Sequence, residues 1–388
     1  MATLNSIVLV SPKSAHEFTI SILEKYGVPL DRAALVADSL VLADLRGVDT
    51  HGINRLGGYI ERIKHNVLDP NPTLTFVMKT PVMAHLDAQN TFGFVAGSVA
   101  IDKGIEIAST FGIGIVAVKN SNHYGMAATY LVRAINAGFA AFAFTNASRS
   151  MPPWGAKEPL FGTSPFAVGI PGGKEGDFLL DMSPSVAARG KIRKAARRGE
   201  KIPEGYALDE EGRPTTDAEA ALRGVVKAAR RGEKIPEGYA LDEEGRPTTD
   251  AEAALRGVVL PIGGPKGSGL AMMMDLFGGL MSGASFAGGV NDQYKNMDEP
   301  QGVGHWFMVF KPDMFLDSKE EFISSMDTLM TKVRGCEKAA GVDRIYTSGE
   351  IERGVEEKRR GEGIPYTQGE IDALHCLAKE SGSDRRLI

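Results

Sequence analysis

The first seventy residues carry apolar side chains at helical spacing. Ser14 and Glu17 have the spacing of a capping box before an apolar run that ends near Tyr26. Asp31 can cap a second helix over residues 32–45. Residues 46–52 are then predicted to form a loop and residues 53–63 a third helix. The N-terminal part of the chain is therefore expected to be helical.

From residue 75 onward, short apolar runs of strand length alternate with stretches of helical spacing. The predicted strands cover residues 75–78, 82–87, 113–119, 139–145, 166–170, 178–181 and 305–310. The predicted helices cover residues 96–109, 125–137, 265–281 and 318–333. Residues 361–366 are expected to form a loop, and Thr367 and Glu370 have capping-box spacing before a short terminal helix. This alternation indicates an α/β fold.

A tandem duplication interrupts the middle of the chain, because residues 194–226 and 227–259 are identical. A period of 33 residues is close to that of helical solenoids, but two copies without the solenoid consensus do not make such a fold. Complete identity indicates a recent duplication, an engineered insertion or an error of sequence assembly. Two copies cannot fill one place in a fold, so we expect one to pack natively and the other to be extruded at the surface. Long insertions cost little loop-closure entropy, and the sequence does not decide which copy is native.

The composition is that of a soluble globular protein, with 388 residues, 43% hydrophobic and 24% charged. The net charge of −5 argues against a protein that binds nucleic acid by neutralising phosphates. Two cysteines cannot build a disulfide framework, and the N-terminus lacks a signal-peptide pattern, so a cytoplasmic location is expected. The longest apolar stretch, residues 269–289, contains Asp275 and several glycines. It is expected to be a buried helix and a loop, so no membrane association is predicted.

Two glycine-rich stretches resemble phosphate-binding motifs. Residues 112–117 have part of a dinucleotide fingerprint, but they follow a predicted helix and open a strand, which is the reverse of the Rossmann order. Residues 263–269 precede a predicted helix. They could hold a phosphate at its N-terminus or form a plain turn, and both interpretations stay open. No histidine, cysteine or carboxylate pattern has metal-ligand spacing, and no Gly-x-Ser-x-Gly elbow indicates a hydrolase.

Two histidines lie in settings suited to chemistry. His51 follows Thr50 and precedes Arg55 by one helical turn, an arrangement that suits a general acid beside a carboxylate clamp. His123 lies between a predicted strand and a predicted helix, where α/β proteins gather ligands. Each could instead be a structural histidine. The other histidines lack comparable settings and are interpreted as structural: His16, His65, His85, His305 and His375.

Six stretches of the chain together resemble the malate/L-lactate dehydrogenase type 2 family. They are residues 44–55 (DLRGVDTHGINR), 120–125 (NSNHYG), 152–155 (PPWG), 162–165 (GTSP), 181–191 with DMS and ARGK, and 261–269 (PIGGPKGSG). The family also includes sulfolactate, ureidoglycolate and diketogulonate dehydrogenases or reductases and piperideine-carboxylate reductases. The similarity covers about residues 10–375, less one copy of the repeat.

The resemblance implies an enzyme that transfers hydride between NAD(P)H and a small 2-oxo or 2-hydroxy acid of the malate or lactate kind. NAD and NADP are both possible cofactors. It also implies a non-Rossmann mixed sheet flanked by helices, with the N- and C-terminal helical segments packed together, in a homodimer. Two alternatives stay open. One is a cyclic imine reductase, which Lys191 disfavours because some relatives have an aspartate there. The other is a homologue that the duplication has silenced.

The resemblance also assigns residues. It implies that His51 donates the proton, that Thr50 orients it and that Arg55 binds the substrate carboxylate, while His123 is an acid/base group or part of the cofactor loop. Thr50 replaces the commoner serine, and Ser348 stands where many relatives have proline. The implied cofactor-binding residues are His123, Tyr124, Gly125, Thr163, Asp181, Met182, Ser183, Arg189, Gly190, Lys266 and Gly267, and more loosely Ser348, Gly349 and Glu350. No metal is implied.

The expected domain organisation follows from the same motifs. Residues 1–70 are predicted to form a helical subdomain on the substrate side, and residues 71–315 a cofactor-binding α/β domain that includes the duplication. Residues 316–388 are predicted to be a helical segment that returns to the N-terminal subdomain.

Overall fold

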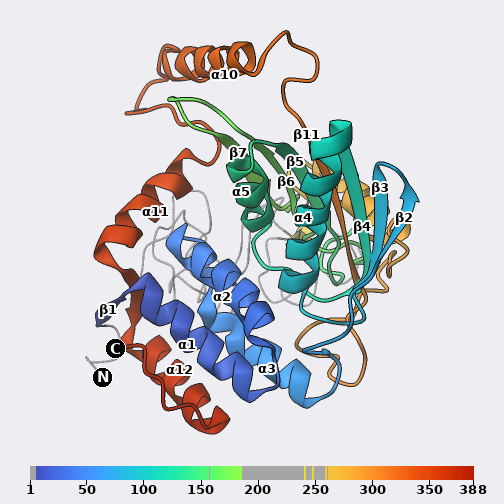
Figure 1. Cartoon of the computed structure of the whole chain (residues 1–388), viewed down its shortest axis with the longest axis vertical. Coiled ribbons are helices and arrows are strands. Elements are labelled where there is room, and N and C mark those ends of the chain that lie inside the picture. The colour runs from blue at the N-terminus through green and yellow to red at the C-terminus, as the bar shows by residue number, and fades with distance from the viewer. Residues whose placement is uncertain (1–5, 157, 186–239, 242–246, 249–257, 260) are drawn as a thin grey trace.

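The centre of the molecule is a seven-stranded mixed sheet with the order β2-β3-β4-β11-β5-β6-β7 (Figure 1). The structure, a computed structural model, describes residues 6–156, 158–185, 240–241, 247–248, 258–259 and 261–388. Strands β3 and β4 are parallel, and the other neighbouring pairs are antiparallel. The strands are β2 (Phe76–Thr80), β3 (Met83–Asp87), β4 (Ile113–Ser121), β5 (Ala140–Thr145), β6 (Phe166–Ile170), β7 (Phe178–Met182) and β11 (Val303–Phe310). The predicted non-Rossmann mixed sheet is confirmed.

Helices cover both faces of this sheet. Helices α4 (Gly93–Phe111) and α5 (Ala128–Asn136) lie on one face, where Phe307 and Val309 of β11 join the main apolar core. Helix α9 (Pro265–Asp275) and the π-helical turn η3 (Leu276–Leu280) lie on the other, against Trp306 and Phe144. Successive side chains of a strand point to opposite faces, so β11 supplies both cores.

The glycine-rich stretch at residues 112–117 lies where helix α4 ends and strand β4 begins. Gly112 ends α4 in the left-handed conformation with φ +81°, and its N–H donates to the carbonyl of Ala108. Strand β4 begins at the next residue. A residue without Cβ adopts this conformation without strain. The observed order confirms that the stretch is not a Rossmann fingerprint.

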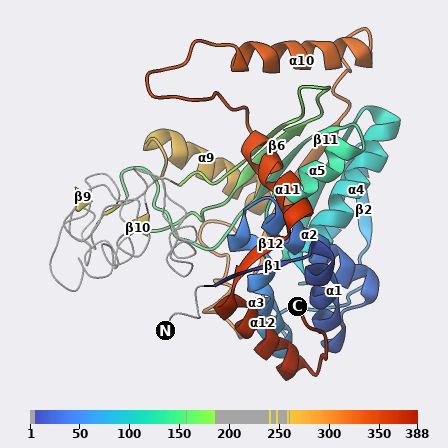
Figure 2. The ribbon, with the colours of Figure 1, turned by 90° about the vertical axis from the view of Figure 1, so that its left-hand side faces the viewer.

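The two ends of the chain form one helical layer beside the sheet. Strand β1 (Ile7–Val10) pairs antiparallel with β12 (Ile364–Thr367), which joins the N-terminal and C-terminal parts of the chain (Figures 1 and 2). The helices of this layer share a second apolar core. They are α1 (Pro12–Lys25), α2 (Leu30–Leu45), α3 (Leu56–Lys64) and α12 (Gln368–Ser381), with α11 (Glu350–Glu362) along α2. The predicted packing of the N- and C-terminal segments against each other is confirmed.

Several predicted boundaries were wrong. Helix α1 begins at Pro12 and is capped by Ser11, whose hydroxyl accepts from the backbone N–H of Ser14, so the capping-box assignment fell one turn too late. Asp31 lies in the first turn of α2 and is not its cap. Residues 361–366 are not a loop, because α11 continues to Glu362 and β12 follows. Helix α11 lacks a clear apolar stripe, since ion pairs rather than a core hold much of it, and hydrophobic spacing therefore did not reveal it.

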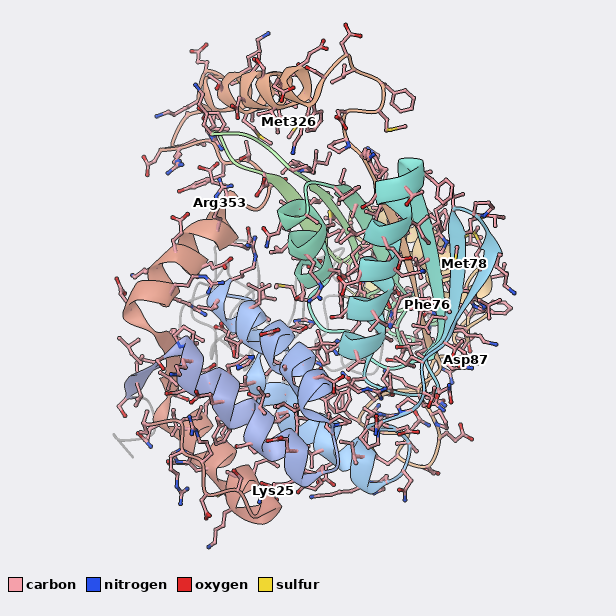
Figure 3. The ribbon with its side chains drawn as sticks, viewed as in Figure 1. Lys25, Phe76, Met78, Asp87, Met326 and Arg353 are labelled. Atoms are coloured by element: carbon pink, nitrogen blue, oxygen red, sulfur yellow. The ribbon has the colours of Figure 1, made fainter. Side chains whose placement is uncertain are left out.

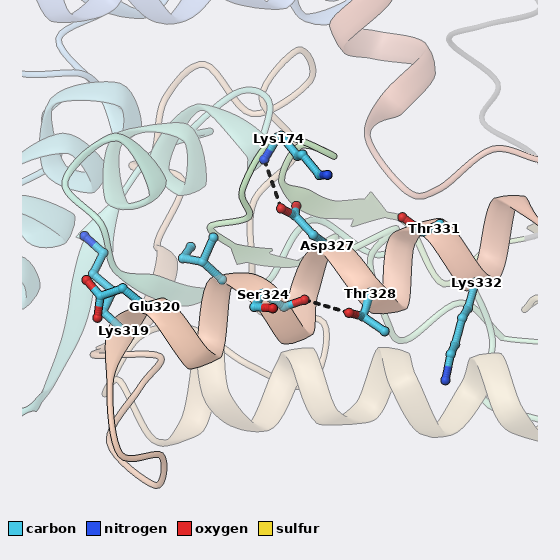
Figure 4. A pocket seen from close by; sticks show the side chains of 9 residues that line it. Lys174, Lys319, Glu320, Ser324, Asp327, Thr328, Thr331 and Lys332 are labelled. Atoms are coloured by element: carbon cyan, nitrogen blue, oxygen red, sulfur yellow. Dashed lines mark hydrogen bonds between the residues drawn. The ribbon is translucent and has the colours of Figure 1, made fainter.

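Helix α10 (Lys319–Arg334) lies at one end of the sheet, apart from the helical layer (Figure 1). Ser318 caps it, and Met326 points from it toward the body of the molecule (Figure 3). The Asp327 carboxylate accepts from the backbone N–H groups of Lys174 and Glu175 at 3.3 and 3.0 Å, which ties α10 to the hairpin between β6 and β7. A groove of about 800 Å³ lies along this contact (Figure 4).

The duplicated segments lie mainly outside the described residues. The described pieces of the second copy are β8 (Ala240–Leu241), β9 (Pro247–Thr248) and β10 (Val258–Val259), which form a sheet of their own. Within the described part of the chain, no helix is both long and apolar enough to span a membrane.

Candidate active site

A buried carboxylate shapes the turn that carries His51. Asp44 is fully buried at the end of α2, and its Oδ2 accepts from the backbone N–H of Ile53 at 2.9 Å and from the Tyr366 hydroxyl at 2.7 Å. The chain passes so close to this carboxylate that a Cβ at Gly52 would lie 1.7 Å from Asp44 Oδ1. Two short 3-10 turns, η1 (Asp49–His51) and η2 (Ile53–Arg55), therefore wrap around Asp44 and lead into α3. This anchoring sets the direction of His51 and Arg55.

The predicted proton donor and carboxylate clamp lie together. The Thr50 Oγ1 is 2.9 Å from Nδ1 of His51. Arg55 donates through Nε to the carbonyl of Thr50 and through Nη1 to the hydroxyl of Tyr294 at 2.9 Å. Within the described ranges, no carboxylate forms an ion pair with Arg55. A guanidinium with unpaired N–H groups beside an imidazole suits recognition of a ligand carboxylate.

His123 joins this group from the loop after β4. Its ring stacks on that of His51, with centroids 5.5 Å apart and planes inclined by 23°. Its Nδ1 is 2.8 Å from the hydroxyl of Tyr59, and its backbone N–H donates to Oε1 of Gln301 at 2.9 Å. Burial, followed by the charges of Arg55 and His51, holds the pKa of His123 well below its ordinary value. His123 is therefore neutral near pH 7.

A second buried histidine supports the loop that carries His123. His305 of β11 lies between the Thr145 hydroxyl, 2.8 Å from Nδ1, and the Ser121 hydroxyl, 2.8 Å from Nε2. Its ring stacks on Tyr124 with centroids 4.7 Å apart. Burial lowers the pKa of His305 to about 3, so this ring is neutral too. His305 thus links β4, β5 and β11 at the end of the sheet where residues 122–125 leave it.

Two of the predicted cofactor residues, Tyr124 and Asp181, lie close together. Oδ2 of Asp181 accepts from the backbone N–H of Ala128 at 2.8 Å, at the start of α5. Burial raises the pKa of Asp181 to about 6, and burial and the charge of Asp181 raise that of Tyr124. The hydroxyl of Tyr124 is buried without a hydrogen-bond partner in the part of the chain that the structure describes. An orphaned buried hydroxyl is costly unless a ligand or water satisfies it.

The glycine-lysine turn before α9 lies beside the chain that follows β7. The backbone N–H of Ile262 donates to the carbonyl of Pro184 at 2.8 Å, and Ser185 forms a β-bridge with Pro261. A Cβ at Gly267 would lie 2.4 to 2.7 Å from backbone atoms of Ile262 and Pro184, so this glycine permits the close approach. Of the other predicted cofactor residues, Thr163 and Lys266 are exposed, Met182 and Ser183 are half-buried, and Arg189 and Gly190 lie outside the described residues.

The loosely predicted residues at 348–350 lie elsewhere, beside the first half of β7. The carbonyl of Ser348 accepts from the N–H of Leu179 at 3.1 Å. Burial opposes ionisation of Glu350, but hydrogen bonds from Thr347 and Arg334 outweigh it and lower the pKa of Glu350 to about 2. This carboxylate therefore ties α11 to α10. Gly349 lines a groove of about 590 Å³, together with Arg46 and with Arg353, which Figure 3 labels on α11.

Sequence reasoning missed four residues of this site: Asp44, Tyr59, Tyr294 and Gln301. Tyr59 could have been found, because His51, Arg55 and Tyr59 recur at intervals of four, the spacing of one helical face. Tyr294 and Gln301 carry no local signal, since they reach the site only through the folding of the loop before β11. The groove under α10 contains none of the predicted site residues.

Comparison with known proteins identifies relatives of this chain. The profile of the malate/L-lactate dehydrogenase family matches residues 10–229 and 224–375, and the two matches overlap at the junction of the repeats. The L-sulfolactate dehydrogenase of Methanocaldococcus jannaschii is 35% identical over 378 residues, which cover 97% of this chain and 98% of the relative. The malate dehydrogenase of Pyrococcus abyssi is 34% identical, covering 97% and 95%.

Solved structures agree with this comparison. The sulfolactate dehydrogenase from Methanocaldococcus jannaschii superposes with a TM-score of 0.82 at 33% identity, and the match covers 98% of both chains.

More distant relatives by sequence, both 29% identical, include a (2R)-3-sulfolactate dehydrogenase (NADP(+)) from Chromohalobacter salexigens and a ureidoglycolate dehydrogenase (NAD(+)) from Escherichia coli K12. The first covers 95% of this chain and 98% of its own length, and the second 92% and 91%.

Proposed function

The chain belongs to the malate/L-lactate dehydrogenase family and is an NAD(P)-dependent 2-hydroxyacid dehydrogenase, and we propose that the cluster of Thr50, His51, Arg55 and His123 is its active site. The observation that supports this assignment is the meeting of the two histidine rings, 5.5 Å apart, beside the Arg55 guanidinium. These residues come from two segments about seventy positions apart in the chain.

Arg55 binds the carboxylate of the substrate. Its planar guanidinium matches a carboxylate with two parallel hydrogen bonds, and its contacts with the Thr50 carbonyl and Tyr294 hold the plane still. Fixing the carboxylate fixes the neighbouring C2 carbon, and with it the face that can react. Such orientation supplies a large part of the reduction in the activation barrier.

His51 supplies the proton in the direction of reduction. As C2 gains hydride, negative charge develops on the carbonyl oxygen, and transfer of a proton from His51 to this oxygen produces the hydroxyl group. The Thr50 hydroxyl at Nδ1 orients the ring and directs proton exchange to Nε2. In oxidation of the 2-hydroxy acid, His51 takes the same proton back. When bound, the nicotinamide cofactor supplies or accepts the hydride.

The described residues fit a nicotinamide dinucleotide. The buried, unpartnered hydroxyl of Tyr124 offers a hydrogen bond next to the His123 loop. The turn before α9, which carries the exposed Lys266 and leads into an eleven-residue helix, contacts the chain at Pro184 and Ser185. A cation and a helix N-terminus both favour phosphate groups. We assign Gly125, Thr163, Asp181, Met182 and Gly267 to the same cofactor-binding region. Ser348, Gly349 and Glu350 lie toward α10 and α11, where the Glu350 carboxylate accepts hydrogen bonds from Arg334 and Thr347.

The substrate that we propose is a small 2-oxo acid and its 2-hydroxy acid, of the kind represented by malate and sulfolactate in the names of the relatives. We also propose that the enzyme works as a homodimer. Either cofactor, NAD or NADP, is compatible with relatives of equal identity.

The test is a panel of 2-oxo acids (oxaloacetate, sulfopyruvate and pyruvate) with one cyclic imine carboxylate, each assayed with NADH and with NADPH. We expect the dihydronicotinamide absorbance to fall with at least one 2-oxo acid. Turnover of the imine alone would replace the proposed substrate class. Binding of NADH or NADPH, seen as fluorescence quenching, without turnover of any substrate would indicate that the duplication has silenced the enzyme.

A further inference from the structure

Tyr59 is held rigidly against the active-site histidine. Its side chain is buried on α3, with 4% of its surface exposed. Phe94 packs edge-on against its ring with centroids 5.2 Å apart, and Phe92 does the same at 6.3 Å. The phenol therefore has one orientation, and its oxygen lies 2.8 Å from Nδ1 of His123. None of the sequence motifs assigned a role to this residue.

The direction of this hydrogen bond follows from its neighbours. Arg55 lies close enough to Tyr59 to act on it through both its charge and a hydrogen bond. A guanidinium has only N–H donors, so the phenol oxygen accepts from Arg55. The phenol hydrogen then needs an acceptor, and within the described residues the one in hydrogen-bond reach is Nδ1 of His123. Nδ1 is therefore an acceptor and carries no proton.

The tautomer of His123 follows from this direction. A neutral imidazole whose Nδ1 accepts a hydrogen bond carries its proton on Nε2. Burial raises the pKa of Tyr59 and lowers that of His123, so the proton stays on the phenol. Besides Tyr59, the ionisable groups that face His123 are Arg55, His51 and His305, and none of them is a carboxylate.

The loop around His123 is fixed as well. Its backbone N–H donates to Gln301, and the neighbouring Asn122 side chain donates to the carbonyls of Asn90 and Thr91 at 2.7 and 3.0 Å. In the part of the chain that the structure describes, no group hydrogen-bonds Nε2 of His123. The Nε2–H is thus oriented by the protein and available to a ligand.

We propose that Tyr59 is a positioning residue that holds His123 in its Nε2–H tautomer, so that His123 donates a neutral hydrogen bond to the carbonyl oxygen of the substrate while His51 transfers the proton. The inference rests on the proposed function of this site. His123 gains and loses no proton in the reaction; the proton on the product hydroxyl comes from His51, and the hydride comes from the cofactor. The two histidines thereby have different tasks although their rings stack.

The tautomer can be measured without turnover, by two-bond ¹H–¹⁵N correlation spectra of the full-length protein with ¹⁵N-labelled histidine. The His123 signals are assigned by their loss in His123→Gln. We expect the Nε2–H pattern at pH 7 in the wild type. In Tyr59→Phe, which keeps the ring but removes the donor, we expect an Nδ1–H population to appear and the pKa of His123 to rise, because the neutral form loses a hydrogen bond.

Activity supplies the second measurement. Loss of an oriented donor to the developing oxyanion lowers kcat by about tenfold or more in Tyr59→Phe, with KM changed by no more than about twofold. Tyr130→Phe is the matched control, because it also removes a buried phenol donor, which contacts the carbonyls of Tyr124 and Gly93 at 2.6 and 3.4 Å, but leaves the Nδ1 contact intact. It is expected to lower the melting temperature similarly while keeping the wild-type His123 pattern.

Two results would overturn the inference: an Nδ1–H or doubly protonated His123 in the wild type at pH 7, or an unchanged His123 pattern in Tyr59→Phe. Neither depends on finding a substrate. If the tautomer is as expected and no 2-oxo acid is reduced with either cofactor, the proposed function fails while the hydrogen-bond assignment stands.

Discussion

At the scale of single residues, the site depends on side chains that share one short segment. His51, Arg55 and Tyr59 follow one another at intervals of four along two 3-10 turns and the start of α3. Their contacts link imidazole, guanidinium and phenol, and the opposing loop supplies His123. A change in any of these groups therefore alters a defined part of the chemistry.

Replacing Arg55 by lysine tests the carboxylate clamp. Lysine keeps the positive charge but cannot form two parallel hydrogen bonds in one plane. We expect KM for the 2-oxo acid to rise by about 100-fold, the equivalent of two strong hydrogen bonds, with a smaller effect on kcat. Steady-state kinetics measure both.

The control for this substitution is Arg133→Lys. Arg133 also makes a two-pronged contact, with Asp102 at 2.8 and 2.7 Å, but on the surface of α5 and α4. The KM of Arg133→Lys for the 2-oxo acid should stay at the wild-type value. Equal KM values in the wild type and Arg55→Lys would remove Arg55 from substrate binding.

Asp181 makes stability depend on pH. Its pKa is raised from an ordinary 3.8 to about 6 in the folded protein, mainly by burial. The folded state therefore holds a proton that the unfolded state has lost between about pH 4 and pH 6, and this carboxyl group destabilises the fold progressively as pH rises through that window. Above about pH 6, the ionised Asp181 lowers the free energy of unfolding by roughly 3 kcal/mol at most.

Asp181→Asn should thus be as stable as the wild type at pH 4 and more stable at pH 8. Asparagine cannot ionise, and its carbonyl oxygen can still accept from Ala128. Melting temperatures at the two pH values, measured without cofactor, give the difference. A difference in melting temperature between the two proteins that is the same at both pH values would contradict the burial cost assigned to Asp181.

At the scale of elements, the site depends on how the turn at 49–55 is held between α2 and α11. Arg46 pairs with Glu356 at 2.8 Å, and Arg359 of α11 pairs with Asp49 and also donates to the carbonyl of Asp44. Both acidic partners and Arg46 are largely buried, so these pairs are screened less than surface pairs. A helix from the C-terminal part of the chain thereby fixes the geometry of an N-terminal turn.

Gly52→Ala tests the close approach of this turn to Asp44. The added methyl group would overlap the Asp44 carboxylate, so the turn must shift and carry His51 and Arg55 with it. We expect a stability loss on the order of 3 kcal/mol and a fall in kcat/KM of about 100-fold or more. Thermal unfolding and kinetics are measured on the same preparation.

Gly57→Ala is the matched control, five residues further on in α3. A Cβ there would meet nothing nearer than Leu377 at 3.9 Å. Alanine should raise stability by up to about 1 kcal/mol, since it favours the helix over glycine, and leave activity unchanged. If both variants behaved alike, the close approach at Gly52 would not matter.

At the scale of the whole molecule, the duplication lies between two points that are already joined. Ser185 and Pro261 form a β-bridge, and Ile262 hydrogen-bonds to Pro184, so the chain leaves and re-enters the body of the fold at one place. A segment that begins and ends at neighbouring positions can change in length with little effect on the rest of the molecule. We therefore propose that activity survives the duplication.

Deleting residues 227–259 tests this proposal. Shortening the segment between Ser185 and Pro261 by 33 residues lowers its closure entropy cost by about 0.5 kcal/mol, which corresponds to a rise in melting temperature of about 1 °C. KM and kcat should match those of the full chain, because the bridge at the two flanks is unchanged. Appearance of activity only after the deletion would show that the second copy had blocked the site.

Much of the fold could be predicted from local patterns. Apolar runs predicted all seven strands of the central sheet. For every strand except the exposed edge strand β2 the reason is burial, because a strand buried on one or both faces needs apolar side chains whatever its partner. The capping box at Thr367 and Glu370 was also correct, since both of its hydrogen bonds lie within one helical turn. Helix α11 and strands β1 and β12 were missed, because their stability comes from distant partners such as Arg46, Asp49 and each other.

The sequence by itself determined the fold class, the family and the chemical types at the site, because strand periodicity and the motifs around His51 and His123 are local and legible in the residue order. The tertiary structure decided which of those groups meet. It brought His123 onto His51, placed Tyr59 and Gln301 around it, and directed Glu350 toward Arg334 and Arg344. Hydrogen bonds and burial depend on atoms that lie far apart along the chain, so the proton positions and pKa values of the site exist only in the folded molecule.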